Sequence, residues 1–340
     1  MKKGIGVVMK VLGKISLWVP ILFFLTVGLS HGQSTVERIV LKGLDNAVQG
    51  NLAGAKTELQ NALKVDPHYA PVKDYLKALE DVNNGKLKPQ TAIAFLKGAQ
   101  YAMRGEWAKA IERYTKAIKM NPGFAMAYSY RGVVQDVNGR FRKALSDHRE
   151  AVDLDPTNAM AYTYLGLAYS HNGKNIQAIE NFTHAIQINP RLAMAYYNRG
   201  ISYSAQDRYV QAILDYDKAI EINPRYARAF NNRGNAYLRK EKPDNAIEDC
   251  MMAIELDPNL ASAYNNLGAG YATKGQFGKA IFNYNRAIAL NPRFALAYFN
   301  RGSARMVMGN QMEACSDLKK ACDLTPCPNN VMTEIMQQCK

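Results

Sequence analysis

A proline recurs at a fixed interval through most of this chain. From residue 122 onward the spacing is 34 residues every time, and each proline follows an asparagine or an aspartate except the last, which follows Thr325. A fixed period of this length predicts one small structural unit stacked many times, because a single copy cannot bury its own apolar face. The prolines of the series are Pro122, Pro156, Pro190, Pro224, Pro258, Pro292 and Pro326.

Small residues form further columns with the same period. When each proline is counted as position 32 of its repeat, position 8 is glycine and positions 20 and 27 are alanine in all seven copies. Two helices approach closely only where side chains are small, and the aromatic residues common at positions 4 and 24 then fill the space between helix pairs. The proline suits the start of a helix, where its missing N–H is not needed. The columns therefore predict an all-α chain of paired helices.

The period and the columns resemble those of the tetratricopeptide repeat. The resemblance covers residues 36–326 apart from one interruption, and it implies a right-handed α-solenoid of about eight antiparallel helix pairs. A degenerate first copy occupies residues 33–69, and seven regular copies occupy residues 91–326. Residues 70–90 exceed the period, and their apolar spacing predicts one irregular, inserted helix that interrupts the stacking. Residues 327–340 are expected to form a C-terminal capping helix.

The first 32 residues have the layout of a signal peptide. They contain four lysines and no acidic residue, and an apolar run at residues 15–29 precedes small polar residues. The run is shorter than the ~20 apolar residues that a spanning helix needs, so we expect cleavage after Gly32. The alternative is an uncleaved membrane tether through residues 11–29. Both predict export of the remaining chain, periplasmic or secreted, because the lysines keep the N-terminus in the cytoplasm.

The exported part stays basic. Without the four leader lysines the formal charge falls from +14 to +10, with 39 basic and 29 acidic residues. Such a charge suits an acidic protein or peptide partner. Nucleic acid is not an expected partner, because the basic residues are spread along the chain and the protein is predicted to leave the cytoplasm.

Four of the five cysteines lie at the C-terminal end. Cys250 takes the place of a core aromatic residue at position 24, which predicts a buried free thiol. Export favours disulfides among the other four, and a terminal helix that returns antiparallel brings Cys315 level with Cys339. A Cys322–Cys327 bridge at the turn would be the second, although four thiols allow three pairings. A zinc site of the same four residues is the rival interpretation, with spacing that is poor for zinc.

Position 6 is the most informative column for binding. The resemblance implies that positions 2, 5, 6, 9 and 13 line the concave face of the solenoid. Position 6 is an asparagine in four consecutive repeats, and an amide can pair with the C=O and N–H groups of an extended peptide. This resembles the asparagine ladder of superhelical members of the family. The alternative is that the amides bond to neighbouring helices. The ladder residues are Asn198, Asn232, Asn266 and Asn300.

Three further residues extend this candidate peptide site. Tyr130 and Tyr164 occupy position 6 in the two preceding repeats, where they either contact a peptide or pack in the core, and Arg228 at position 2 could meet one acidic group. Arginines at position 7 in four repeats give the appearance of a basic stripe. Because Leu165 and Leu267 fill the same column, we expect these arginines to pack by their stems with the guanidinium exposed.

A catalytic constellation is missing from the sequence. Four histidines follow the leader, but they fall in different repeats and columns, so we predict neither an enzyme nor a cofactor or metal site. The preferred interpretation is a non-enzymatic scaffold that binds proteins or extended peptides in its concave groove. The alternative is a structural spacer or assembly factor of an envelope complex that uses other surfaces. The sequence does not identify the partner or the oligomeric state.

Overall fold

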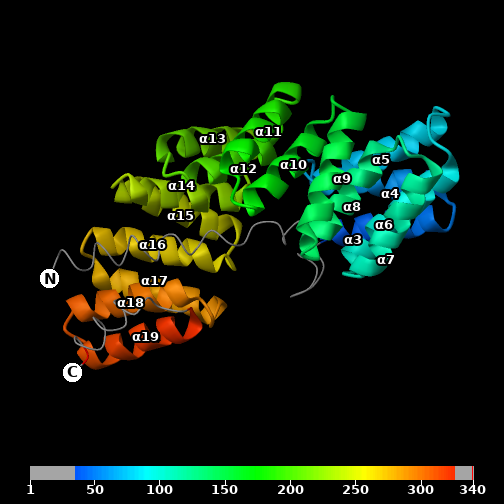
Figure 1. Ribbon diagram of the computed structural model, residues 1–340. Helices are drawn as coiled ribbons and strands as arrows, with labels where there is room; N and C mark the ends of the chain where they lie inside the picture. The colour runs from blue at the N-terminus through cyan, green and yellow to red at the C-terminus, as the bar shows by residue number, and fades with distance from the viewer. Residues whose placement is uncertain (1–34, 326–338, 340) are drawn as a thin grey trace. The chain divides into compact units, whose positions relative to one another are not determined.

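The computed structural model describes residues 35–325 and residue 339, and every helix or strand among them is an α-helix (Figure 1). The chain divides into two compact units. We call described residues 35–195 the N-terminal unit and residues 196–325 with Cys339 the C-terminal unit. The helices are α3 (Thr35–Val48), α4 (Leu52–Val65), α5 (Ala70–Asn83), α6 (Pro89–Met103), α7 (Trp107–Met120), α8 (Ala125–Val137), α9 (Phe141–Leu154), α10 (Ala159–His171), α11 (Asn175–Ile188), α12 (Ala193–Ser204), α13 (Tyr209–Ile222), α14 (Ala227–Arg239), α15 (Pro243–Leu256), α16 (Ala261–Thr273), α17 (Phe277–Leu290), α18 (Ala295–Val307) and α19 (Gln311–Leu324).

Each regular repeat is a pair of helices stacked on the next pair. Within the N-terminal unit α6 packs on α7, α7 on α8, α8 on α9 and α9 on α10, and in the C-terminal unit the same order runs from α13 to α19. Figure 1 shows α14 to α19 as successive layers of this kind. The all-α solenoid predicted from the period is thereby confirmed. The predicted leader and capping helix lie outside the described residues, with Cys339 as the one exception.

The proline columns mark the ends of the second helices. In the repeat that ends at Pro122, the N–H of Asn121 donates to the carbonyl of Ala117, and the Asn121 side chain accepts from the N–H of Gly123. The asparagine thus closes one helix and turns the chain, while the following proline cannot continue it. The same bond of an asparagine or aspartate recurs at Asp155 and Asn189.

The glycine and alanine columns form the contact within each pair. A Cβ added to Gly98 would lie 2.6 Å from Cε1 of Tyr114, and one added to Gly268 would lie 2.6 Å from Cε1 of Tyr284. Position 8 must therefore be glycine wherever a ring occupies position 24, because an added methyl group has no space. The alanines of position 20 are fully buried from Ala110 to Ala314.

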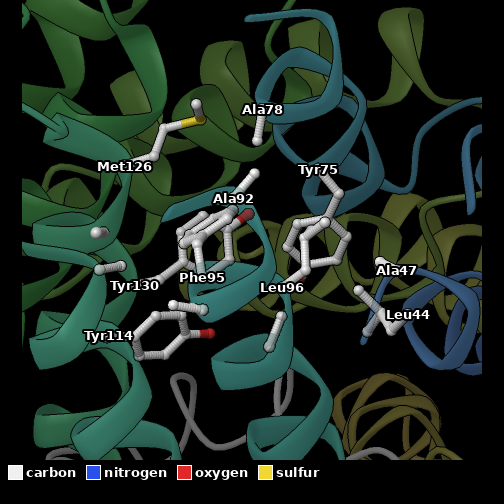
Figure 2. Packing of buried hydrophobic residues seen from close by; sticks show 14 of the residues in the cluster. Leu44, Ala47, Tyr75, Ala78, Ala92, Phe95, Leu96, Tyr114, Met126 and Tyr130 are labelled. Carbon is white, nitrogen blue, oxygen red and sulfur yellow. The ribbon is translucent and has the colours of Figure 1, made fainter. Parts of the chain in front are cut away.

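The first helix pair departs from the regular stacking. In regular repeats the second helix of one pair contacts the first helix of the next, whereas here α3, the first helix, packs against α6, and α4 packs against α5. Helix α5 therefore does not form a helix pair like those of the regular repeats. It contacts α4 and α6. It belongs to the large apolar core that runs from Val40 to Val134 in the N-terminal unit (Figure 2).

Candidate functional site

Three of the four ladder asparagines of the C-terminal unit join a chain of hydrogen bonds across four helices. The amide Nδ2 of Asn300 in α18 donates to Oδ1 of Asn265 in α16 at 2.9 Å, and Nδ2 of Asn266 donates to Oδ1 of Asn231 in α14 at 3.0 Å. Nδ2 of Asn232 then donates to the hydroxyl of Tyr197 in α12 at 3.1 Å. Position 6 of α14, α16 and α18 thus donates to position 5 of the preceding first helix.

Neighbouring residues on one helix close the remaining links. Asn231 donates to Oδ1 of Asn232 at 3.1 Å, and Asn265 donates to Oδ1 of Asn266 at 3.3 Å. The amides consequently form one continuous path in the order Asn300, Asn265, Asn266, Asn231 and Asn232, in which every Nδ2 donates to the next residue and the last one donates to Tyr197. For Asn232, Asn266 and Asn300 the structure contains the bonds to neighbouring helices that the sequence allowed as the alternative to ligand binding.

Burial differs along the ladder. Asn198 and Asn266 are buried, while Asn232 and Asn300 are half-buried, and Asn235 at position 9 of α14 is exposed. The bonds described above use one N–H and one lone pair of Asn232, and an amide carries two of each. Because the amide of Asn232 also hydrogen-bonds with the hydroxyl of Tyr216, one further group of this amide remains with which Asn232 can meet a ligand.

Arg228 lies close to this path. Its positive charge acts on the hydroxyls of Tyr197 and Tyr226, whose rings are 4.7 Å apart between centroids. Burial raises the pKa of both hydroxyls, and the guanidinium opposes that rise. The first helices of the C-terminal unit contain no acidic residue from Ala193 to Val307. The helices that carry the ladder therefore offer amides, hydroxyls and positive charge, a composition compatible with an anionic group on a ligand.

The arginines of position 7 are not exposed as the sequence led us to expect. Arg233 makes a two-pronged salt bridge to Asp249, sixteen residues further on, with distances of 2.8 and 2.7 Å, and also bonds to Asp217 of the preceding pair. Such a planar pair holds both partners in one geometry. The same bridge recurs in three other repeats. The pairs are Arg131–Asp147, Arg199–Asp215 and Arg301–Asp317.

The sequence contains a signal for these bridges sixteen residues after position 7. Where position 7 is leucine, at Leu165 and Leu267, the residue sixteen positions later is Asn181 or Asn283. Arginine thus goes with aspartate and leucine with asparagine. Burial raises the pKa of Asp249, and the bonds from Arg233 counteract that rise, so the aspartate is tolerated there because the arginine is present.

Tyr130 and Tyr164 are placed differently from the asparagines. Both are buried, and their rings lie 6.0 Å apart. The hydroxyl of Tyr130 donates to Oδ2 of Asp74 in α5 at 3.0 Å. Helix α5 thus contacts Tyr130 at position 6, and the ring of its Tyr75 lies 6.1 Å from that of Phe95 at position 5.

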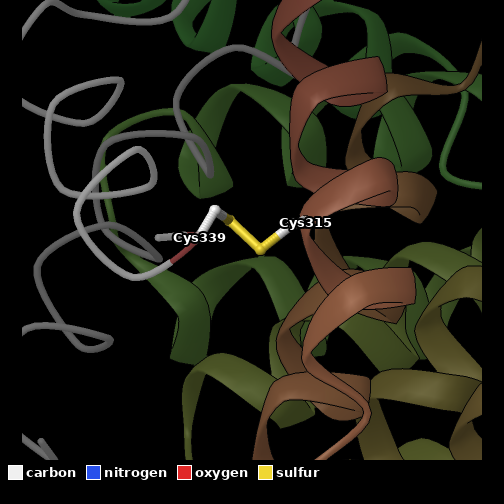
Figure 3. The surroundings of a disulfide bond; sticks show 2 residues. All are labelled: Cys315 and Cys339. Carbon is white, nitrogen blue, oxygen red and sulfur yellow. A yellow bond between two sulfur atoms is a disulfide. The ribbon is translucent and has the colours of Figure 1, made fainter.

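The C-terminal end carries one disulfide among the described residues. Cys315 in α19 is bonded to Cys339, with Cα atoms 5.7 Å apart (Figure 3). This is the pairing that the sequence placed first, and its Cα separation lies in the usual range for a disulfide. Cys327 lies outside the described residues, and with it the second predicted bridge. Cys250 is a buried free thiol, as expected, and burial raises its pKa.

Among the described residues, His148 and Asp136 form a buried pair of titratable side chains of the kind found in active sites. Nε2 of His148 lies 3.2 Å from Oδ2 of Asp136, and both side chains are almost fully buried. Burial lowers the pKa of the nearby His171 to about 4. Within the described ranges there is no group of three or more His, Cys, Asp or Glu side chains that could hold a metal ion.

Comparison with known families places the repeat. Models described as tetratricopeptide repeat match residues 96–159, 149–180, 193–226 and 227–260, and a model described as TPR repeat matches residues 270–309. Together they match more than half of the chain. No protein in the curated set matches it. Among the described residues, no helix has the length and apolar character needed to cross a membrane.

Solved structures share the fold at low sequence identity. The chain of the APC/C hetero-tetramer Cut9-Hcn1 is 19% identical, with a TM-score of 0.60 over 78% of this chain and 53% of that one. This chain thus spans about half the length of that relative. A tetratricopeptide repeat protein from Parabacteroides merdae is 20% identical, with a TM-score of 0.57 over 74% and 98%. Pseudomonas aeruginosa pilF is 21% identical, with a TM-score of 0.55 over 63% and 97%.

Proposed function

Since the chain belongs to the tetratricopeptide-repeat family, whose repeats generally act as non-catalytic scaffolds for protein partners, we propose that it binds extended polypeptide outside the cytoplasm. The binding face is the row of first helices α12, α14, α16 and α18. Asn198, Asn232, Asn266 and Asn300 contact the backbone of the bound chain, and Arg228 contacts an acidic group on it.

The observation that carries this proposal is the directional path of amides. Because every Nδ2 donates to the next residue of the path, the amides have fixed orientations before a ligand arrives, and less entropy is lost on binding. First helices of neighbouring pairs lie ~8–10 Å apart, and an extended chain rises ~3.3 Å per residue. Each asparagine would therefore meet about every third residue, independently of side-chain sequence.

Two features support a location outside the cytoplasm. The first 32 residues have the composition of a signal peptide. The Cys315–Cys339 disulfide suits an oxidising compartment such as the periplasm or the exterior. N-terminal sequencing of the protein from the producing cell tests this part, because cleavage after Gly32 gives a chain that begins at Gln33.

The experiment on binding uses a library of random twelve-residue peptides. We expect the wild type to select peptides without a side-chain consensus, and the variant with alanine at all four ladder positions to lose at least tenfold in affinity for them. A matched control carries Asn245→Ala and Asn259→Ala, at exposed positions that are not part of α12, α14, α16 or α18. If the fourfold variant keeps its helicity and binds the peptides as well as the control does, peptide binding by the ladder asparagines is rejected. That result would favour the alternative of a structural spacer that uses other surfaces.

A further inference from the structure

Helix α5 lies against positions that line the binding face in the resemblance to the family. Tyr75 of α5 contacts Phe95 at position 5 of α6 and Tyr130 at position 6 of α8, with ring centroids 6.1 and 5.7 Å apart. Figure 2 shows Ala78 of α5 near Ala92, at position 2 of α6. Positions 5 and 6 are the columns that carry the asparagines in the C-terminal unit. We call Ala92, Phe95, Leu96, Met126 and Tyr130 the aromatic groove.

The contact surface of α5 is amphipathic and well defined. Its buried residues Val72, Tyr75, Ala78 and Leu79 recur at the spacing of one helical face, and each is at most 2% exposed. The opposite face carries the exposed Lys73 and Glu80. A helix that lies with one apolar face in an apolar groove is a common mode of peptide recognition.

Polar contacts fix the position of α5 in the groove. Asp74 accepts a hydrogen bond from the hydroxyl of Tyr130, and Lys77 lies 3.7 Å from Asp155, beyond the end of α9. The carboxylate of Asp74 is thus bound by Tyr130 of the groove, and Asp74 directly precedes the aromatic Tyr75 in the sequence. The pattern presented by α5 is an acidic residue, an aromatic residue, and then a small and an apolar residue three and four positions after the aromatic one.

The attachment of α5 to the rest of the unit is short and exposed. Residues 83–86 are exposed, and Gly85 there has a positive φ of 71°. The helix also lies outside the 34-residue period, so the regular contacts between repeats do not involve it. Its departure would leave the pairs α6–α7, α8–α9 and α10–α11 with all their mutual contacts.

We propose that the aromatic groove is a second binding site, for an amphipathic helix of a partner protein with the pattern of α5, and that α5 is its built-in competitor. This site differs from the amide path in its position, in its apolar character and in the conformation of its ligand. Binding of the partner helix displaces α5, and the affinity is reduced by the free energy needed to release it.

The test uses a labelled peptide of residues 69–84 and the full chain. In the variant Ala78→Arg a charged side chain enters the face of α5 that is fully buried, while every groove residue stays unchanged. We expect this variant to bind the peptide at least tenfold more tightly than the wild type does. The matched control Glu80→Arg, on the exposed face, should bind like the wild type. A peptide with Tyr75→Ser should bind at least tenfold more weakly than the unchanged peptide.

Two results would overturn the proposal. One is an Ala78→Arg variant of native helicity that binds the peptide no more tightly than Glu80→Arg does. The other comes from amide hydrogen exchange in the wild type, which is informative even where a variant fails to fold. We expect the amides of α5 to exchange through local opening, faster than those of α6 and α8. Exchange of all three helices at one common rate excludes displacement of α5.

Discussion

The two units place opposite chemistry on the same repeat positions. In the N-terminal unit, positions 5 and 6 of α6 and α8 are Phe95, Leu96, Ser129 and Tyr130, all buried, and α5 contacts this surface. In the C-terminal unit, the same positions carry the amides of α14 and α16, joined in one hydrogen-bonded path. Among the described residues of that unit, the main contacts of α14, α16 and α18 are with helices that are near in sequence.

The difference shows how a solenoid can vary its surface without changing its fold. Glycine at position 8 and alanine at positions 20 and 27 are common to the regular repeats of both units, and they determine how the helices pack. Positions 5 and 6 lie outside that contact, so they can hold rings in one unit and amides in the other. Rings require an apolar covering to leave water, whereas amides satisfy one another.

We expect the largest difference between the units from the salt bridges of the position 7 arginines. Three of these four bridges lie in the C-terminal unit. Arg233→Leu leaves the carboxylate of Asp249, only 8% exposed, without its main partner. We expect this change to lower the free energy of unfolding of the C-terminal unit by about 3–5 kcal/mol. Alkylation of the buried thiol of Cys250, located by peptide mapping, should become between roughly 150-fold and 5,000-fold faster.

The chain supplies its own control for this prediction. The double variant Arg233→Leu with Asp249→Asn reproduces the leucine and asparagine found together at Leu267 and Asn283. The free energy of unfolding of its C-terminal unit should lie within about 1 kcal/mol of the wild-type value, because no buried charge is left unpaired. If the double variant is as unstable as the single one, the pairing of the columns is not the cause of the loss.

Asp74 gives the N-terminal unit a pH dependence that no residue of the amide path can have. Burial raises the pKa of its carboxyl to about 6, against the hydrogen bond from Tyr130 and the charge of Lys77, which lower it. A group with a raised pKa in the folded state stabilises that state fully at low pH. This contribution is then lost as the pH rises from about 4 to about 6.

The variant Asp74→Asn should remove this pH dependence. At neutral pH we expect it to raise the free energy of unfolding of the N-terminal unit by about 3 kcal/mol, the equivalent of a two-unit pKa shift. The gain should shrink below pH 6 and vanish near pH 4, where Asp74 is already neutral. Fluorescence of Trp107, the one tryptophan after residue 32, reports on this unit in denaturant. A gain that is equal at pH 4 and pH 7 would contradict the role of the charge.

The sequence predicted the fold well and the candidate site only in part. The 34-residue period and the small columns identified the helix pairs, since close packing leaves few residue choices at positions 8, 20 and 27. The pairing of Asn232 with Tyr197 and of Asn266 with Asn231 was not predicted, because it joins residues 35 positions apart through side-chain geometry. The contact of α5 with Tyr130 depends on how an inserted helix lies in space, and a repeat pattern contains no information on a helix outside its period.

The smallest difference between the units concerns the turn inside each helix pair. Position 15 has a positive φ throughout, and in the N-terminal unit it is always glycine, but in the C-terminal unit it includes Asp207 and Glu241, with φ of 58° and 57°. A side chain in this conformation costs about 1 kcal/mol, so Glu241→Gly should stabilise the C-terminal unit by somewhat less than that, because glycine also loses more freedom on folding. Alkylation of Cys250 should become about two- to fivefold slower.

The reciprocal change Gly139→Glu, at the same turn of the N-terminal unit, should lower the denaturant midpoint followed by the fluorescence of Trp107. If Glu241→Gly instead speeds alkylation, contacts of the glutamate outweigh the backbone cost, and this turn does not distinguish the two units.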